Sequence, residues 1–255
     1  MKSNLIDSPA SIATLINTIV NLPTNPPSLY LDLEGINLSR LDSISILQLL
    51  LHPQNHVYLI DIHVLGTAAF TTPGSGGTTL QSILESPTIP KVFFDVRNDS
   101  NALFLHHGIA LQGVQDVQLM ECASRAGVGF SRKFLHCLRR CITTDAPIAV
   151  QQKQTWTAVE AAGTMLYAPQ KGGSYGIFNE RPLREEIRAY CVQDVQFLPV
   201  LRQTYCGRLQ PIWEARVDVE TTARVQLSQT RAYQPQGPDK AFSPWKDIQA
   251  GSVFI

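Results

Sequence analysis

The stretch "SLYLDLEG", residues 28–35, sets two acidic residues among aliphatic and aromatic ones. Its first half is typical of a buried β-strand, whereas Asp32 and Glu34 stand in its second half. Side chains alternate between the two faces of a strand, so these carboxylates share one face. On a largely apolar strand they repel each other and resist the loss of water. Another group must therefore compensate them, and identifying it is the main functional question.

The composition is that of an ordinary globular protein. The chain has 255 residues, 44% hydrophobic and 16% charged, which is enough for one sizeable domain. Lys plus Arg (21) equals Asp plus Glu (21), so no net positive field attracts a polyanion. The balance argues against non-specific nucleic-acid binding through charge alone, but it leaves room for an enzyme with a local basic rim.

The sequence offers no sign of secretion or of a membrane span. No signal peptide begins at Met1, and no run approaches the roughly 20 apolar residues that span a bilayer. The five cysteines are an odd number in apolar or helical contexts, which favours reduced thiols. We therefore expect an intracellular protein, cytoplasmic or nuclear, that has no membrane partner.

The pattern along the chain predicts strands early and helices late. Aliphatic runs closed by turn residues predict strands at 28–35, 43–53, 56–66 and 90–96. Helical spacing predicts helices over 9–22, 79–86, 98–108, 131–142, 155–168 and 183–209, the last broken near Pro199, and a short strand leading into a helix over 113–126. The fold class is therefore α/β, a mixed sheet layered by helices.

The composition changes after about Leu209. A helix with mixed charges is expected over 210–232, followed by a Pro- and Gly-rich irregular segment over 233–255. We predict two parts, a main domain over 1–207 and a C-terminal helix with an irregular tail over 208–255.

Further acidic residues stand at informative places. Asp95 and Asp99 flank the junction between the predicted strand at 90–96 and the helix that follows it. Asp194 lies four residues after Tyr190, on the same helical face. Taken singly, each has an ordinary explanation, since Asp99 suits a helix N-terminus and Tyr190 with Asp194 suits a surface pair. Asp116, at a predicted strand end, is interpreted as structural.

Taken together, three segments resemble the exonuclease motifs of the ribonuclease D-like 3′→5′ exonucleases. The segments are "YLDLEG", "KVFFDVRNDSNALFLHHGI" and "AYCVQDV", and the resemblance extends from about Leu29 to Tyr205. The residues that match the motifs are Asp32, Glu34, Asp99, Tyr190 and Asp194. A tyrosine four residues before the last aspartate resembles the tyrosine-type branch of this DEDD superfamily. The resemblance implies a ribonuclease H-like mixed β-sheet flanked by α-helices.

The same resemblance implies a metal-dependent 3′→5′ exonuclease that favours RNA over single-stranded DNA. Hydrolysis of a phosphodiester builds up negative charge, which two divalent ions held by carboxylates stabilise. By the resemblance, the ligands of two Mg²⁺ or Mn²⁺ ions are Asp32, Glu34, Asp99 and Asp194. Tyr190 would orient the attacking water, because an ordinary tyrosine pKa of about 10 makes it a poor base. Without metal, Asp32 or Glu34 should have a raised pKa.

Four more residues are candidates for contact with the substrate, namely Leu33, Arg97, Lys171 and Arg181. Leu33 would form an apolar wall beside the terminal nucleotide, and the three cations would contact phosphates, although ion pairs and solvated loops explain them equally well.

Two alternatives to an active enzyme of this type stay open. One is an inactive relative that binds RNA or a protein partner, which the neutral net charge allows and the four filled carboxylate positions disfavour. The other is a different ribonuclease H-like nuclease, which the Tyr-x-x-x-Asp spacing disfavours. Only about 50 residues follow Cys206, too few for the accessory domain of ribonuclease D, so we expect short single-stranded ends as substrates.

Overall fold

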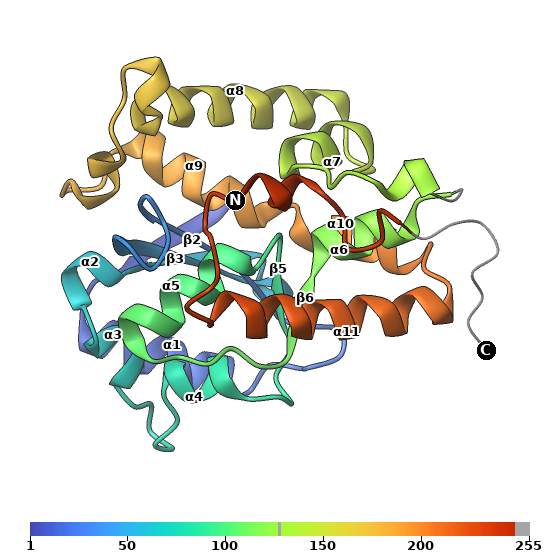
Figure 1. Ribbon diagram of the computed structural model, residues 1–255. Helices are drawn as coiled ribbons and strands as arrows, with labels where there is room; N and C mark the ends of the chain where they lie inside the picture. The colour runs from blue at the N-terminus through green and yellow to red at the C-terminus, as the bar shows by residue number, and fades with distance from the viewer. Residues whose placement is uncertain (127–128, 248–255) are drawn as a thin grey trace.

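A computed structural model describes residues 1–126 and 129–247 of the chain. In these ranges six strands form one mixed sheet in the order β1-β4-β3-β2-β5-β6 (Figure 1). The strands are β1 Lys2–Ile6, β2 Leu29–Ile36, β3 Ser43–Leu51, β4 His56–Asp61, β5 Lys91–Phe93 and β6 Val114–Asp116. β3 runs antiparallel to its two neighbours, β2 and β4. β1 pairs with β4 in parallel, and β5 pairs with β2 and β6 in parallel.

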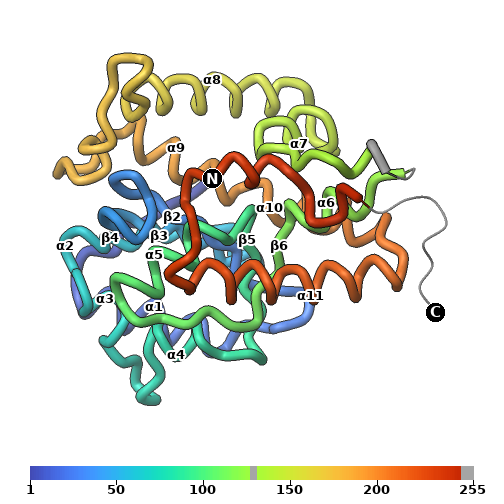
Figure 2. The backbone as a smooth tube through the Cα atoms, viewed as in Figure 1, coloured from blue at the N-terminus to red at the C-terminus, as the bar shows by residue number. Residues whose placement is uncertain are grey.

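Helices cover both faces of this sheet (Figures 1 and 2). The α-helices are α1 Pro9–Ile19, α2 Ile62–Leu65, α3 Ala68–Thr71, α4 Leu80–Glu85, α5 Arg97–His107, α6 Val117–Ser124, α7 Leu138–Thr144, α8 Val150–Tyr167, α9 Glu185–Gln196, α10 Leu198–Cys206 and α11 Pro211–Ser228. Short 3₁₀ turns are η1 His52–Gln54, η2 Gly129–Arg132, η3 Pro169–Lys171, η4 Tyr175–Asn179 and η5 Pro238–Ala241. The mixed sheet flanked by helices agrees with the predicted α/β class.

The alternation along β2 divides its side chains between two apolar cores. Leu31 and Leu33 are buried in a core built with α1, α3, α4 and α5, whereas Tyr30 is buried in a core built with α6 to α10. Asp32 and Glu34 follow Tyr30 at the same two-residue spacing, so they lie on the face covered by α9. The strand thus fixes both carboxylates on one side of the sheet, as its sequence predicts.

Three parts of the predicted secondary structure are wrong. Residues 2–6 form β1, which the sequence analysis did not predict, because a short polar edge strand is stabilised by its parallel pairing with the distant β4. The strand predicted over 56–66 ends at Asp61, whose carboxylate accepts a hydrogen bond from Val64 N and begins α2 instead. The helix predicted over 131–142 begins only at Leu138, since residues 133–135 pair with the C-terminal segment.

Helix α11 packs against α5, α6 and β6. Its Arg224 donates to the buried Asp116 carboxylate at 2.8 Å, and the pair ties the C-terminal part to the end of the sheet. The predicted boundary between 207 and 208 stays a prediction. The predicted irregular segment over 233–255 is seen as turns with η5 up to residue 247, and its last eight residues lie outside the described ranges.

The described residues show no membrane-spanning helix and no disulfide bond. None of their helices combines the length and the apolar character needed to cross a membrane. All five cysteines have free thiols, and only Cys137 among them is exposed.

Candidate active site

Strand β2 presents Asp32 and Glu34 next to an irregularity in its pairing with β3. Asp32 stands opposite Gln48 and Glu34 opposite Ile46, but Gly35 stands opposite Ile44, so Ser45 is an extra residue on β3. A side chain at Gly35 would collide with the backbone, since a Cβ there would lie 2.0 Å from the Ser43 carbonyl oxygen. Such a bulge bends a strand and redirects nearby side chains. Here it follows directly after the second carboxylate.

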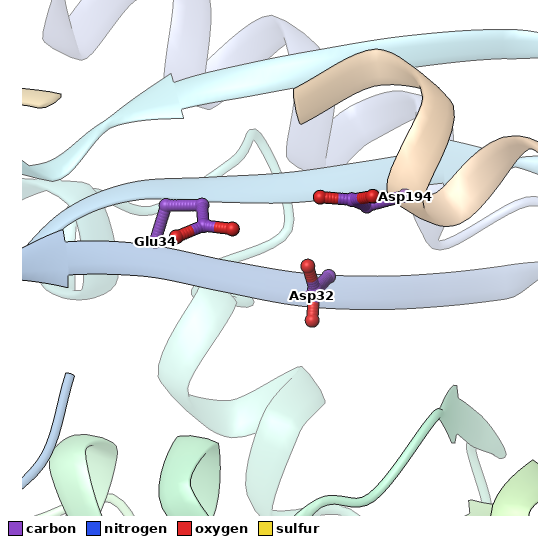
Figure 3. Close-up of side chains that lie close together, drawn as sticks. All are labelled: Asp32, Glu34 and Asp194. Atoms are coloured by element: carbon purple, nitrogen blue, oxygen red, sulfur yellow. The ribbon is translucent and has the colours of Figure 1, made fainter. Parts of the chain in front are cut away.

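Helix α9 brings Asp194 to the two carboxylates of β2. One oxygen atom from each of Asp32, Glu34 and Asp194 can be chosen so that all three lie within 4.8 Å of one another. Figure 3 shows the two β2 side chains and Asp194 turned towards a common space between the strand and the helix. We call these three residues the acidic cluster. Its members come from motifs about 160 residues apart in the sequence, and the fold brings them together as the sequence analysis expected.

Asp99 lies beside the acidic cluster but outside the 4.8 Å group. It is buried in the first turn of α5, and the Asp32 carboxylate helps to raise its pKa after burial itself. The Asp99 and Asp32 carboxylates are therefore close enough in space to interact electrostatically. The assignment of Asp99 as a ligand of a second ion stays a prediction.

Asp95, which flanks the same strand–helix junction as Asp99, is already paired. Arg97 donates to its two carboxylate oxygens at 2.5 and 2.6 Å, and Arg224 lies 3.7 Å away, which together hold its pKa low despite burial. Its backbone has a φ of 62°, which is unusual for a residue other than glycine and turns the chain from β5 into α5. Asp95 therefore shapes the junction that carries Asp99.

Asp116 has the structural role expected for it. Its carboxylate accepts hydrogen bonds from the backbone N–H groups of Asp95, Val96 and Gln118, and it forms the N-cap of α6. The ion pair with Arg224 completes its hydrogen bonding in a fully buried position.

The acidic cluster is electrostatically unfavourable without a cation. Burial raises the pKa of Asp32 to about 7, although the Leu33 backbone N–H offsets part of this shift. Burial first, and then the neighbouring carboxylates, raise the pKa values of Glu34 and Asp194 well above their ordinary range. This agrees with the raised pKa expected from the sequence, because β2 offers the pair no counter-charge.

Tyr190 lies beside the acidic cluster with its hydroxyl protonated. Its pKa is well above the ordinary value, because the side chain is buried and then because Asp194 and Glu34 are close. The hydroxyl lowers the pKa values of Glu34 and Asp194 by hydrogen bonding, and it also lies 3.4 Å from the Tyr167 hydroxyl. Such a group donates hydrogen bonds and does not act as a base near neutral pH.

Two residues that the sequence analysis missed hold Tyr190 in place. The ring of Tyr167 on α8 lies 5.2 Å from that of Tyr190. Gly163 on the same helix faces Tyr190 so closely that a Cβ would lie 2.6 Å from Cδ2 of the tyrosine. No motif marks either residue. A glycine in the middle of an otherwise regular helix is the one available signal, since it is unfavourable there without a packing reason.

The four residues predicted to contact the substrate lie in different surroundings. Leu33 is buried in the apolar core on the opposite face of β2. Arg97 is held by Asp95, and Arg181 is held by both carboxylate oxygens of Asp61 and two backbone carbonyls. Lys171 ends the exposed turn η3. The structure does not bring these side chains into the acidic cluster, and their contact with substrate stays a prediction.

The donor set fits a hard divalent cation. Three carboxylates converge without a cationic side chain among the groups that shift their pKa values, and oxygen ligands of this kind suit Mg²⁺ or Mn²⁺. A cation bound there would remove the repulsion that raises these pKa values.

Comparisons with known proteins agree with this site and fold. The family profile for 3'-5' exonuclease matches residues 6–205. No curated protein sequence matches the chain. Trypanosoma brucei RNase D in complex with the RNA U12 superposes with a TM-score of 0.70 at 21% identity, over 90% of this chain and 71% of that one.

Two bacterial structures share the same architecture. Escherichia coli RNase D, an exoribonuclease involved in structured RNA processing, has a TM-score of 0.56 at 18% identity, over 90% of this chain and 51% of that one. Brucella melitensis NrnC with bound Mg²⁺ has a TM-score of 0.58 at 16% identity, over 92% of this chain and 99% of that one. These likenesses establish the ribonuclease H-like exonuclease fold predicted from the sequence, and the profile match over 6–205 shows that the chain belongs to the 3′-5′ exonuclease family of nucleases.

Proposed function

We propose that this protein is a metal-dependent 3′→5′ exonuclease that removes nucleotides from the 3′ end of single-stranded nucleic acid, with RNA favoured over DNA. The observation that carries the proposal is the convergence of Asp32, Glu34 and Asp194 within 4.8 Å on a strand and a helix of an exonuclease fold. A structural ion pair network would pair these acids with basic side chains instead. Their raised pKa values support a site that a cation completes.

The proposed cofactors are two divalent cations, Mg²⁺ or Mn²⁺, which would stabilise negative charge on the phosphate and activate water. Asp32, Glu34 and Asp194 would hold the cations, and Asp99, beside Asp32, would take part from α5. Support for the metal comes from the Mg²⁺ bound to the structurally similar NrnC.

Tyr190 would position the attacking water or a phosphate oxygen. Its hydroxyl stays protonated because its pKa is raised, so it can donate a hydrogen bond throughout the neutral range. Packing against Tyr167 and Gly163 restricts the ring to one place, and a fixed donor contributes more to catalysis than a mobile one.

The preference for RNA is supported by the structural likeness to an RNase D complexed with the RNA U12. The test uses 5′-labelled 12-nucleotide RNA and DNA of the same sequence, each with Mg²⁺, Mn²⁺ or EDTA. We expect stepwise shortening from the 3′ end that needs the metal and is faster with RNA. Faster shortening of DNA would overturn the preference alone, and retained binding without cleavage of either strand would favour an inactive nucleic-acid-binding relative.

A further inference from the structure

Two aromatic side chains from distant parts of the chain lie together at the surface. Phe134 is 43% exposed and Phe242 is 36% exposed, and their ring centroids are 5.2 Å apart at an angle of 32°. We call this pair the aromatic platform. Exposed rings of this size are unfavourable in water, so an arrangement that keeps two of them adjacent points to a binding role.

The backbone holds the aromatic platform in place. Phe134 and Phe242 face each other in an antiparallel bridge. Leu135 N donates to the Ala241 carbonyl and Ser243 N donates to the Lys133 carbonyl, both at 3.0 Å. Figures 1 and 2 show the C-terminal segment in dark red running back from the end of α11 towards the green segment before α7. The adjacency of the rings is therefore built by main-chain pairing between two segments.

Positive charge surrounds these rings. The Lys133 Nζ lies 5.3 Å from the Phe134 ring centroid, and the Lys246 Nζ lies 5.3 Å from that of Phe242. Residues 122–144 contain five Lys and Arg and no Asp or Glu, in a chain whose net charge is zero. Two of these arginines are paired with Glu121 and Glu160, and the stretch as a whole remains basic. The platform thus combines π faces with nearby cations.

The segment that carries Phe242 also reaches the neighbourhood of the acidic cluster. Lys240 Nζ donates to Asn98 Oδ1 at 2.6 Å, and Arg97 donates to the Lys240 carbonyl at 3.2 Å. Asn98 immediately precedes Asp99 on α5. Lys240 and Phe242 are two positions apart in the chain, which is at most about 7 Å between their Cα atoms. A cavity of about 510 Å³ lies beside this segment, and its lining includes four basic residues, Arg97, Arg224, Lys240 and Lys246, two acidic ones, Glu220 and Asp239, and Phe242.

We propose that Phe134 and Phe242 stack the bases of the single strand that leads to the acidic cluster, and that Lys133 and Lys246 bind its phosphates. Aromatic side chains that stack bases and cations that follow the phosphates are the features by which proteins bind single strands without reading their sequence. The proposal deepens the proposed function and rests on it for the identity of the ligand as substrate. It assigns the C-terminal segment a part in holding nucleotides upstream of the 3′ end.

The test compares long and short ligands with variants of the aromatic platform. Phe134→Leu combined with Phe242→Leu keeps apolar bulk but removes both π faces, and Phe242→Tyr is the matched variant that keeps them. Affinity for a 5′-fluorescent 12-nucleotide strand is measured in the Asp32→Asn background, and dinucleotide hydrolysis is measured in the wild-type background. Circular dichroism checks that each variant is folded.

We expect the double leucine variant to bind the 12-nucleotide strand at least about fivefold more weakly, since stacking of a base contributes roughly 1–3 kcal/mol. Dinucleotide hydrolysis should change less than twofold, and Phe242→Tyr should bind like the parent. Unchanged 12-nucleotide affinity, or an equal loss with both ligands, overturns the platform. A wild-type protein that binds the 12-nucleotide strand through these rings but hydrolyses nothing would leave the platform standing and overturn the proposed function instead.

Discussion

Gly163 on α8 lies against the ring of Tyr190 on α9, and the space between them fits the hydrogen atom of a glycine but no larger side chain. A Cβ at Gly163 would lie 2.6, 2.7 and 2.8 Å from Cδ2, Cγ and Cβ of the tyrosine. Atoms do not approach so closely without displacement, so the absence of a side chain at 163 fixes how near the two helices come. It also fixes where the Tyr190 hydroxyl meets the acidic cluster.

Gly163→Ala is therefore expected to impair activity without touching a carboxylate. The added methyl group must move Tyr190 or separate α8 from α9, at a cost of about 1–3 kcal/mol in folding free energy. We expect kcat to fall by about tenfold or more while KM changes less, because an oriented donor is displaced. Steady-state kinetics and urea denaturation measure the two effects.

The matched control for that change is Gly207→Ala. Gly207 has an ordinary helical φ of −66° and room for a Cβ, whose nearest contact would be 3.4 Å. In a Tyr190→Phe background, Gly163→Ala should add little further loss in kcat, since the hydroxyl it displaces is already gone. An additive loss in the double variant would show that Gly163 acts on activity by some route other than Tyr190.

The Asp116–Arg224 pair predicts that the C-terminal helix is needed for a stable fold. Arg224 donates to Asp116 from α11, and both side chains are buried. Removal of one partner of a buried ion pair costs about 3–5 kcal/mol, because the other charge is left without compensation. We expect Arg224→Met to lower the free energy of unfolding by about this amount and a 1–207 fragment to be still less stable.

Chemical denaturation of these two proteins beside the full chain provides the measurement. Arg231→Met, at an exposed position just after α11, is the control substitution and should change stability by less than about 0.5 kcal/mol. A 1–207 fragment as stable as the full chain would support the predicted boundary at 207/208 as a boundary between independent parts.

The raised pKa of Asp32 predicts how stability of the metal-free protein depends on pH. Folding raises this pKa from 3.8 to about 7, so the folded state binds more protons than the unfolded state between these values. Stability contributed by Asp32 is complete below about pH 4 and is lost as pH rises through about 7. In EDTA, the wild-type protein should lose about 1–4 kcal/mol more between pH 5 and pH 8 than Asp32→Asn does.

The comparison with Asp32→Asn is necessary because other groups titrate in the same range. Burial lowers the pKa values of His56, His107 and His136, and these contribute stability that increases with pH. The variant retains the histidines and removes the carboxylate. A pH dependence that is the same in both proteins would contradict the raised Asp32 pKa, and saturating Mg²⁺ should abolish the wild-type loss at pH 8.

Sequence patterns predicted those features that depend on local spacing. The two-residue spacing of Asp32 and Glu34 placed both on one face of β2, and the four-residue spacing of Tyr190 and Asp194 placed both on one side of α9. The helix predicted over 98–108 is present as α5, which ends at the C-cap Gly108 with a φ of 69°. In each case the periodicity of a single element determines the arrangement.

The resemblance to the exonuclease family predicted that Asp194 meets Asp32 and Glu34. Other features that depend on contacts between distant segments were missed. β1 forms only because it pairs with β4, about 50 residues later in the chain. Residues 133–135 were predicted to be helical, yet they pair with residues 241–243 and form no helix. The sequence predicted Arg181 as a phosphate contact or a solvated loop residue. In the structure its guanidinium group donates to the carboxylate of Asp61, which lies 120 positions earlier. Local propensity carries no information about such partners, so tertiary contacts override it.

The central claim is that the acidic cluster performs metal-dependent hydrolysis from a 3′ end. The most direct measurement follows a 12-nucleotide RNA, 5′-labelled when linear and labelled at an internal phosphate when circular, with wild type and Asp32→Asn in Mg²⁺. The account predicts a ladder that shortens from the 3′ end for linear RNA, an intact circle, and a rate for Asp32→Asn reduced by more than the roughly 10- to 100-fold typical of residues that only support metal ligands. Cleavage of the circle, or wild-type rates in Asp32→Asn, would contradict it.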